Sequence, residues 1–381
     1  MKIKNLPVLR SLGVVGAIFA LTMLLINNIS VFAKPDLKAA PVDPKLAKLN
    51  AQIAAERAKI AAEKNMSKTQ IIQKSSPAEL SYIPDKNAKN NPTLAKINEQ
   101  IFAKKAQIAV NIGIIYLYGH NVSQSYSKAL EYFNAVITNP YADPVSLSQA
   151  QEKLGHMYFN GYGVKQDYSQ ALTYFNAVIK TNTPKVVDSR SLAVAQTGLG
   201  IMYFAGEGVT QSYSHAFTYW NAVVNTDPKF VDPKQLSSIQ EFLGWMYFNG
   251  KGVTQDYNKS FTYFNNVLNS KNLTPFLLAE TQYYLGVMNQ TGQGTAQNTT
   301  QANTYFATAL AGFNSALTDP KYTADKNIIS NINYYLGQVY NNGYGVPQNT
   351  ATALGYYNKV TQDAHWAYAL AQAIINANKA T

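Results

Sequence analysis

The sequence contains no cysteine among its 381 residues and only four histidines. The first absence excludes disulfide bonds and thiolate metal sites. His120, His156, His215 and His365 lie far apart, and no two of them have the spacing of a metal site on one helix. The short motifs of serine hydrolases, P-loop proteins and zinc proteases are also missing. We therefore predict no catalytic residue, no metal and no cofactor.

Charged residues are scarce as well, at 14% of the chain against 46% hydrophobic residues, so most of the chain is expected to fold around a core. The net charge of +11 is uneven, with +7 in residues 34–110 and +1 in residues 111–381. Because the longer part lacks a basic excess, we expect no nucleic-acid partner. The basic part fits either contact with anionic lipid or an acidic cell-wall polymer, or a solvated linker.

The first 33 residues are typical of a secretory signal peptide. Basic residues occur before residue 11, an uncharged apolar run covers residues 12–26, and the Val-Phe-Ala sequence of residues 31–33 presents small residues at the positions that a signal peptidase would read. This pattern predicts an exported protein, periplasmic or secreted, whose mature chain begins at Lys34. The alternative is an uncleaved anchor over residues 11–33, the one way in which we expect the chain to contact a membrane.

Residues 34–93 are rich in proline, lysine and alanine, and poor in core-forming residues, which predicts a linker. Residues 46–61 differ, because Leu46, Leu49, Ile53 and Ile60 follow helical spacing. This short amphipathic helix fits two interpretations: a docking or coiled-coil segment, or a marginal helix in a flexible arm.

Residues 154–179 have recognisable copies along the rest of the chain. Aligned on a Leu-Gly or Ile-Gly step, the copies place a glycine at Gly113, Gly155, Gly200, Gly244, Gly286 and Gly337. Intervals of 42 to 51 residues predict a helical solenoid. In each copy the step belongs to a first helix, helix A, where we expect the small residue to admit a neighbouring backbone.

A Gly-x-Gly loop follows helix A in five copies, and the first glycine is expected to end the helix in the left-handed conformation. The first copy has Asn121 in place of the second glycine, and asparagine tolerates positive φ. A residue suited to cap the next helix, helix B, then recurs, at Ser125, Asp167, Ser212, Asp256, Asn298 and Asn349. A glutamine always precedes this cap, and a hydrogen bond to the loop is one interpretation.

The consensus LGxMYxxGxGVxxDxxxAxxYxxxA resembles the Sel1-like repeat, a relative of the tetratricopeptide repeat. The resemblance covers residues 94–362 and implies an all-α, right-handed superhelical solenoid of about six helix-turn-helix repeats. Copy five departs most, so longer or looser structure is expected near residues 298–325. Residues 363–381, with Trp366, Leu370 and Ile374 at intervals of four, are expected to form a C-terminal capping helix.

The resemblance also implies that helix A lines a concave groove, where a protein or peptide would bind. Two positions on helix A vary among the copies. The position directly after the Leu-Gly step supplies the candidate partner-binding residues His156, Trp245 and Gln338, and the position three residues later supplies Phe159, Phe204 and Phe248. Aromatic residues of low charge suit an extended peptide or a partner helix. The alternative is that the phenylalanines pack between successive repeats.

These observations predict a non-enzymatic protein-interaction scaffold in the bacterial envelope. Exported relatives imply roles in cell-wall regulation or host-cell contact. The competing hypothesis is an envelope enzyme or a direct binder of peptidoglycan or another glycan. The carboxylates Asp167 and Asp256 do not favour an enzyme, because serine and asparagine occupy equivalent cap positions in other copies.

Overall fold

The computed structural model describes residues 75–82, 92–180, 188–271, 273–362 and 365–379, and every regular element in these ranges is helical. The predicted signal peptide and the predicted helix at residues 46–61 lie outside them. No helix within the described ranges is both long enough and apolar enough to cross a membrane.

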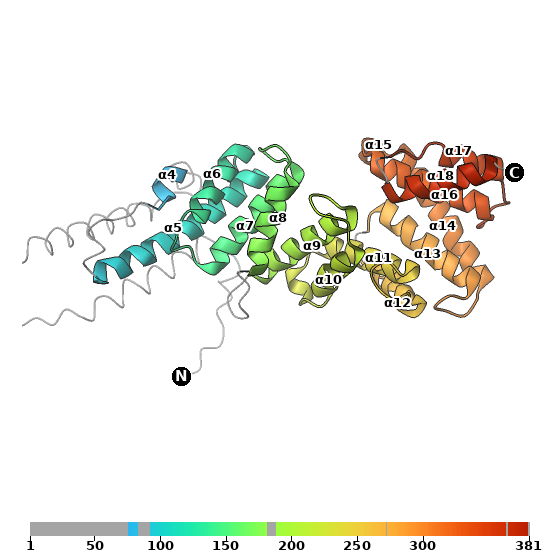
Figure 1. Ribbon diagram of the computed structural model, residues 1–381, viewed down its shortest axis with the longest axis horizontal. Coiled ribbons are helices and arrows are strands. Elements are labelled where there is room, and N and C mark those ends of the chain that lie inside the picture. The colour runs from blue at the N-terminus through green and yellow to red at the C-terminus, as the bar shows by residue number, and fades with distance from the viewer. Residues whose placement is uncertain (1–74, 83–91, 181–187, 272, 363–364, 380–381) are drawn as a thin grey trace, which may run out of the picture.

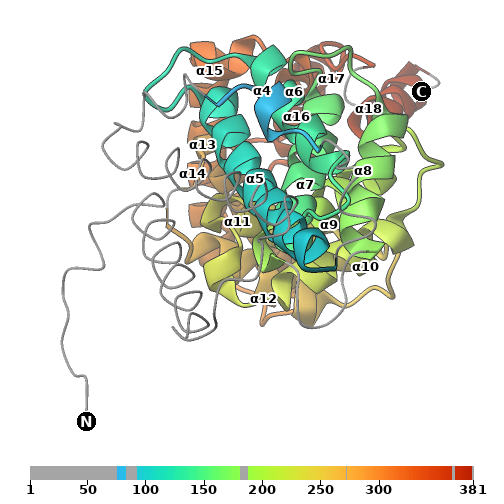
Figure 2. The ribbon, with the colours of Figure 1, turned by 90° about the vertical axis from the view of Figure 1, so that its left-hand side faces the viewer.

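Twelve helices form six consecutive pairs. The first members, helices A, are α5 (Pro92–Tyr118), α7 (Pro144–Asn160), α9 (Ser189–Ala205), α11 (Pro233–Asn249), α13 (Pro275–Thr291) and α16 (Lys326–Asn342). The second members, helices B, are α6 (Tyr126–Ile137), α8 (Tyr168–Lys180), α10 (Tyr213–Val224), α12 (Tyr257–Leu268), α14 (Thr299–Thr318) and α17 (Thr350–Tyr357). The pairs follow one another along the longest axis (Figure 1), and Figure 2 looks along this array from the α5 end. The all-α solenoid expected from the sequence is confirmed.

An aromatic ring of helix B packs onto the glycine of the Leu-Gly step within each pair. In repeat two, a Cβ added to Gly155 would lie 2.7 Å from ring atoms of Phe175. The five other glycines face Phe133, Trp220, Phe264, Phe306 and Tyr357. The expectation that this glycine admits a neighbouring backbone was therefore wrong. The glycine makes room for a buried aromatic ring, because a Cβ at this position would overlap the ring.

The loop between the two helices has the predicted backbone. Gly161 ends α7 with φ 72°, and Asn121 has φ 60°, the only positive φ of a non-glycine residue among the described residues. The second loop glycine joins neighbouring repeats, because a Cβ at Gly163 would lie 2.5 Å from the Cβ of Tyr126, at the start of the preceding helix B.

The glutamine before each cap has a defined role. Its side-chain amide donates a hydrogen bond of 2.8 Å to a carbonyl in the last turn of helix A, as in the bond from Gln211 to the carbonyl of Phe204, and the same bond occurs in all six repeats. The acceptor is the helix end and not the loop. Each predicted cap also accepts a hydrogen bond from a backbone N–H three residues later.

We expect Gln211→Leu to lower the free energy of unfolding by about 1 kcal/mol, since it removes one hydrogen bond that satisfies a helix-terminal carbonyl. Chemical denaturation followed by circular dichroism measures the change. Thr210→Ala, an exposed change in the same loop, is the control. Equal stability of the two variants would show that the glutamine does not hold the loop.

Repeat five is longer than the others, as predicted, but it is regular. Its helix B, α14, has 20 residues and is followed directly by the short helix α15 (Pro320–Thr323). The extra turns displace the next junction, so that Gly345 lies against Phe306 inside α14 and not against the first residue of the helix.

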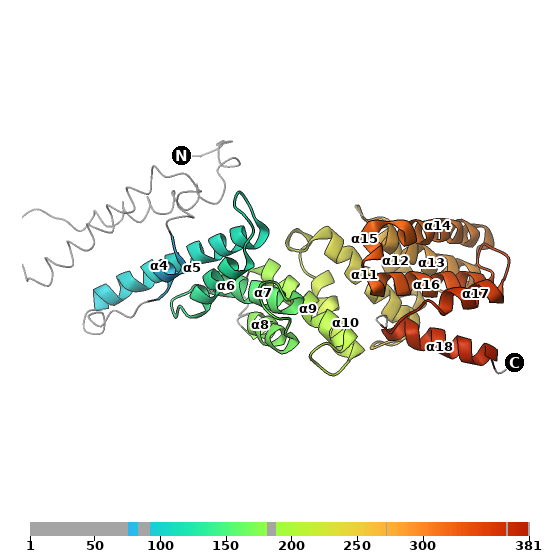
Figure 3. The same ribbon diagram turned by 90° about the horizontal axis from the view of Figure 1, so that it is seen from above.

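Both ends of the array are covered by further segments. Residues 75–82, within the predicted linker, include the short helix α4 (Pro77–Leu80) and pack on the first repeat, where Leu80 is buried and Tyr82 meets Phe102 edge-on at 4.9 Å. At the other end, α18 (His365–Lys379) lies beside α16 and α17 (Figure 3).

The predicted capping helix is therefore present, but Leu370, one of the apolar residues that predicted it, lies outside its buried face. Ala367, Ala371 and Ile375 are buried, whereas Leu370 is 47% exposed. The small alanine side chains allow α18 to lie close against the last repeat, which turns Leu370 outward.

Candidate functional site

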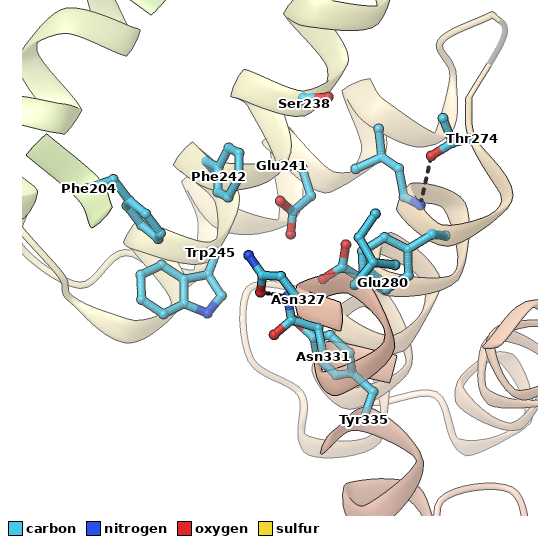
Figure 4. Close-up of a pocket in the computed structure, with 13 residues that line it drawn as sticks. Phe204, Ser238, Glu241, Phe242, Trp245, Thr274, Glu280, Asn327, Asn331 and Tyr335 are labelled. Atoms are coloured by element: carbon cyan, nitrogen blue, oxygen red, sulfur yellow. Dashed lines mark hydrogen bonds between the residues drawn. The ribbon is translucent and has the colours of Figure 1, made fainter. Parts of the chain in front are cut away.

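A cavity of about 270 Å³ lies between the helices A of repeats three to six. Its walls come from helices A and their N-terminal caps: α9 supplies Phe204, α11 supplies Glu241 and Trp245, α13 supplies Glu280, and α16 supplies Tyr335. No helix B contributes to the described lining. Figure 4 shows the carboxyl groups of Glu241 and Glu280 pointing toward one another from their two helices.

Local sequence fixes where these side chains point. The N-cap residues Asp232 and Thr274 start α11 and α13, and each helix ends at a left-handed glycine. Leu243 and Leu285, which lie next to the packing glycines, are fully buried and set the rotation of the two helices. Glutamates two residues before Leu243 and five residues before Leu285 are thereby directed to the cavity.

Burial dominates the electrostatics of the site. Glu241 is only 5% exposed, and burial raises the pKa of its carboxyl to about 8. Burial and the neighbouring Glu241 raise the pKa of Glu280 well above its ordinary value, while a hydrogen bond with Tyr335 acts in the opposite direction. Burial likewise raises the pKa of Tyr284, whose hydroxyl lies 3.3 Å from that of Tyr335. The site therefore favours neutral carboxyl groups when nothing is bound.

Two acceptor groups in the cavity have no partner. No hydrogen bond or ion pair joins the Glu241 carboxyl to any described residue, and its oxygens, unlike Asn331 Oδ1, remain accessible from the cavity. The Oδ1 atom of Asn331 is buried without a hydrogen bond, although its Nδ2 donates to Asn327 at 3.3 Å. Burying a polar group without a partner is unfavourable.

Aromatic rings form one wall. Trp245 and Phe204 meet edge-on with centroids 5.6 Å apart, and Phe242 lies 5.2 Å from Phe204. Phe242 in turn stacks on Trp220 at 4.8 Å, which fixes the wall to the core. The described lining includes no lysine, arginine or histidine. A cation that contacts these carboxyl groups and ring faces must therefore come from another molecule or from another part of the chain.

Two of the six predicted binding residues meet at this cavity, Phe204 and Trp245. Phe248 packs instead on Tyr257 and on Tyr284 of the next repeat, at 5.5 and 5.4 Å. Phe204 also packs across a repeat junction, so both phenylalanines have the packing role that was the alternative, and Phe204 borders the cavity as well. Their part in binding stays a prediction.

The other three predicted residues lie away from the cavity. His156 is half-buried beside Tyr162, and burial together with the ammonium group of Lys153 lowers the pKa of its imidazole. Phe159 packs edge-on against Tyr168 at 5.4 Å. The side chain of Gln338 donates a hydrogen bond to the Tyr334 hydroxyl at 3.1 Å.

Sequence reasoning missed Glu241 and Glu280 of the cavity, although the sequence contains a signal for Glu241. Glu152 and Glu241 occupy the same position of helix A, two residues before the Leu-Gly step, and both are buried. A charged residue at a core-facing position is rare without a partner. In repeat two the next residue, Lys153, pairs with Glu152 at 2.8 Å, whereas Phe242 follows Glu241.

Known proteins place the chain in a family. The Sel1 repeat model matches residues 109–135, 148–177, 193–222, 239–265, 279–311 and 333–359, one match for each helix pair. Sel1 repeats generally mediate protein–protein binding, and proteins of this fold are generally non-catalytic scaffolds. No curated protein matches the chain.

Among solved structures, the chain is similar to a protective antigen of uropathogenic Escherichia coli strains that displays an SLR fold, with 23% identity over 74% of this chain and a TM-score of 0.42. It spans 59% of that antigen's chain. It is also similar to a Sel1 repeat protein from Oxalobacter formigenes, with 20% identity, 70% of this chain and 87% of that chain covered, and a TM-score of 0.41. Six family matches that coincide with six helix pairs show that the chain belongs to the Sel1 repeat family.

Proposed function

We propose that the protein is a non-enzymatic scaffold that binds an extended segment of a partner protein along the inner face of its helices A. One observation carries this proposal: four successive helices A, from α9 to α16, together line one cavity with half-buried aromatic rings. A surface shared by several repeats suits an extended ligand, because each repeat contributes a few side chains to a continuous path.

In-cell photo-crosslinking tests this proposal. A photoreactive residue at Ile201, exposed on helix A, should capture a partner protein, and one at Thr218, exposed on helix B, should not. Mass spectrometry of the adducts identifies the captured segment. Equal capture from both positions would mean that the inner face has no special role.

Trp245 is the residue through which we expect the largest loss of binding. Trp245→Ala should weaken capture of the partner by about 2 kcal/mol, the scale of an aromatic hot spot. Phe175→Ala removes a fully buried ring and should cost about 3 to 5 kcal/mol of stability, so it serves as the core control. Melting and binding are measured on both variants. If Trp245→Ala melts as early as the control, or binds as tightly as the parent, the ring does not contact the partner.

The envelope is our proposed location, supported by the basic start, apolar run and small residues of the first 33 positions. There the scaffold would act in cell-wall regulation or host-cell contact. N-terminal sequencing of protein recovered from cells should find Lys34 at the mature terminus. Met1 on membrane-bound protein would point to the uncleaved anchor instead.

The carboxyl pair makes an envelope enzyme the second candidate, since glycoside hydrolases use two such groups beside the sugar. That chemistry requires one protonated acid and one ionised carboxylate with separated pKa values. Here burial raises the pKa of both Glu241 and Glu280, so neither is poised as the base near neutral pH. A peptidoglycan pull-down and a hydrolysis assay with purified protein test this alternative, and retention without other proteins would favour direct glycan binding.

A further inference from the structure

The carboxyl of Glu241 has an unusual environment among the described residues. It is buried, it faces the cavity, and no described residue supplies a hydrogen bond or a positive charge to it. Glu280 faces it from α13 (Figure 4). A buried and a partly buried carboxyl group that face one another can be stabilised by protons, or by one cation placed between them.

Repeat two shows which cation suits this position. Glu152 occupies the equivalent place on α7, and its carboxylate holds the Lys153 ammonium at 2.8 Å. The same ammonium lies 5.8 Å from the centre of the Tyr118 ring. An ammonium between a buried carboxylate and an aromatic face is therefore already built once in this chain.

The cavity in repeats three to six also has a glutamate carboxyl and an aromatic ring, but its described lining includes no lysine, and its ring, Trp245, has a different register position from Tyr118. Phe242 stands where repeat two has Lys153, and Trp245 provides the ring face. Aromatic faces attract ammonium and guanidinium groups when these are desolvated. The unpartnered Asn331 Oδ1 adds a third acceptor for a donor group. A volume of about 270 Å³ admits one long side chain and excludes a folded element.

We propose that this cavity binds the charged end of a lysine or arginine side chain presented by the partner's extended segment, with Glu241 and Glu280 as its anionic ligands. This inference rests on the scaffold function proposed above and names the chemistry that the partner must carry. The cation replaces the protons that the carboxyl groups hold when the cavity is empty, so binding releases protons near neutral pH. The titratable groups that share this field are Glu241, Glu280, Tyr284 and Tyr335.

Fluorescence of Trp245 reports directly on the cavity. A background with Trp220→Phe and Trp366→Phe in the full chain leaves Trp245 as the single tryptophan. Phenylalanine is native at the place of Trp220 in repeats two and four, as Phe175 and Phe264. The probes are Nα-acetyl-lysine methylamide, its Nε-acetylated form, and the norleucine analogue that lacks the ammonium, at constant ionic strength.

The lysine probe should change the emission saturably, with a Kd on the order of 1 to 10 mM for a ligand of this size. The two uncharged probes should bind at least about tenfold more weakly. Glu241→Gln and Glu280→Gln should each weaken the lysine probe about tenfold, whereas Glu131→Gln, an exposed change of the same charge, should leave it unchanged. Affinity should rise from pH 6 to pH 9. Equal binding of the three probes, or binding unaffected by both cavity variants, would overturn the proposal.

The outcomes also separate this inference from the scaffold proposal. Crosslinking that captures a partner from Ile201, together with a lysine probe that does not bind, would retain the scaffold and reject the cation site. Binding of the probe without any captured partner would retain the cation site and reject the scaffold. Captured segments without lysine or arginine would contradict the inference even if the isolated probe binds.

Discussion

Gly155→Ala is expected to lower the free energy of unfolding by about 3 kcal/mol, although alanine is the better helix former. The new methyl carbon would lie 2.7 Å from the Phe175 ring of α8, and that buried ring is confined on its other side by Gly198 of α9. Either the helix pair separates or the ring leaves its favoured rotamer. Chemical denaturation monitored by circular dichroism measures the loss.

The same substitution at Gly355 is a matched control with the opposite expected sign. Gly355 lies within α17, and a Cβ there meets nothing within 4 Å. Gly355→Ala should therefore raise stability by up to about 1 kcal/mol through helix propensity alone.

A double-mutant cycle tests the contact itself. Phe175→Leu should relieve part of the stability lost in Gly155→Ala, because the smaller side chain leaves room for the new methyl group. Additive losses would show that the two residues do not share one contact.

Glu241→Gln is expected to stabilise the protein, and the gain should grow with pH. Burial raises the pKa of Glu241 from 4.5 to about 8. The folded parent therefore holds the Glu241 proton more tightly than the unfolded chain does. The contribution of this group to stability is fully present below about pH 4.5 and is lost as the pH rises to about 8. A neutral glutamine has no such dependence. At pH 9 the variant should exceed the parent by on the order of 2 to 4 kcal/mol, and at pH 5 by much less.

Denaturation at pH 5, 7 and 9 gives the comparison, with Glu131→Gln as the exposed control. The control should follow the parent at each pH. A constant difference between Glu241→Gln and the parent across the three values would mean that the carboxyl is ionised in the folded protein throughout. The residual slope of the variant then includes Glu280 and Glu152, whose pKa values are also raised by burial, and His156, whose pKa is lowered by burial.

Local features of the fold could be predicted because each copy repeats them. Six caps, the loop glycines and the tolerance of Asn121 for positive φ follow from single residues and their neighbours. The partner of the packing glycine could not be predicted in the same way, because Phe175 lies twenty residues later and the contact depends on how two helices cross. The outward position of Leu370 depends similarly on packing against the last repeat.

The cavity was harder to foresee, since its residues belong to four different repeats. Trp245 and Phe204 were selected by their register on helix A, and they do meet. Glu241 and Glu280 occupy different register positions on successive helices, so an alignment of copies does not pair them. Glu241 stands out when repeat four is compared with repeat two. Glu152 is followed by its partner Lys153, whereas the equivalent Glu241 is followed by Phe242.

The glutamine bond and the junction glycine also bear on how such a chain can change its length. The glutamine bond closes within one repeat, and each junction from Gly163 to Gly294 lies against the tyrosine that begins the preceding helix B. A duplication or deletion of one whole repeat in this region would therefore restore both contacts without any compensating substitution. Gly345 breaks the rule, because it lies against Phe306 inside a longer helix. Repeats two to four can thus be duplicated or deleted with both contacts restored, while repeats five and six fit each other only as a unit.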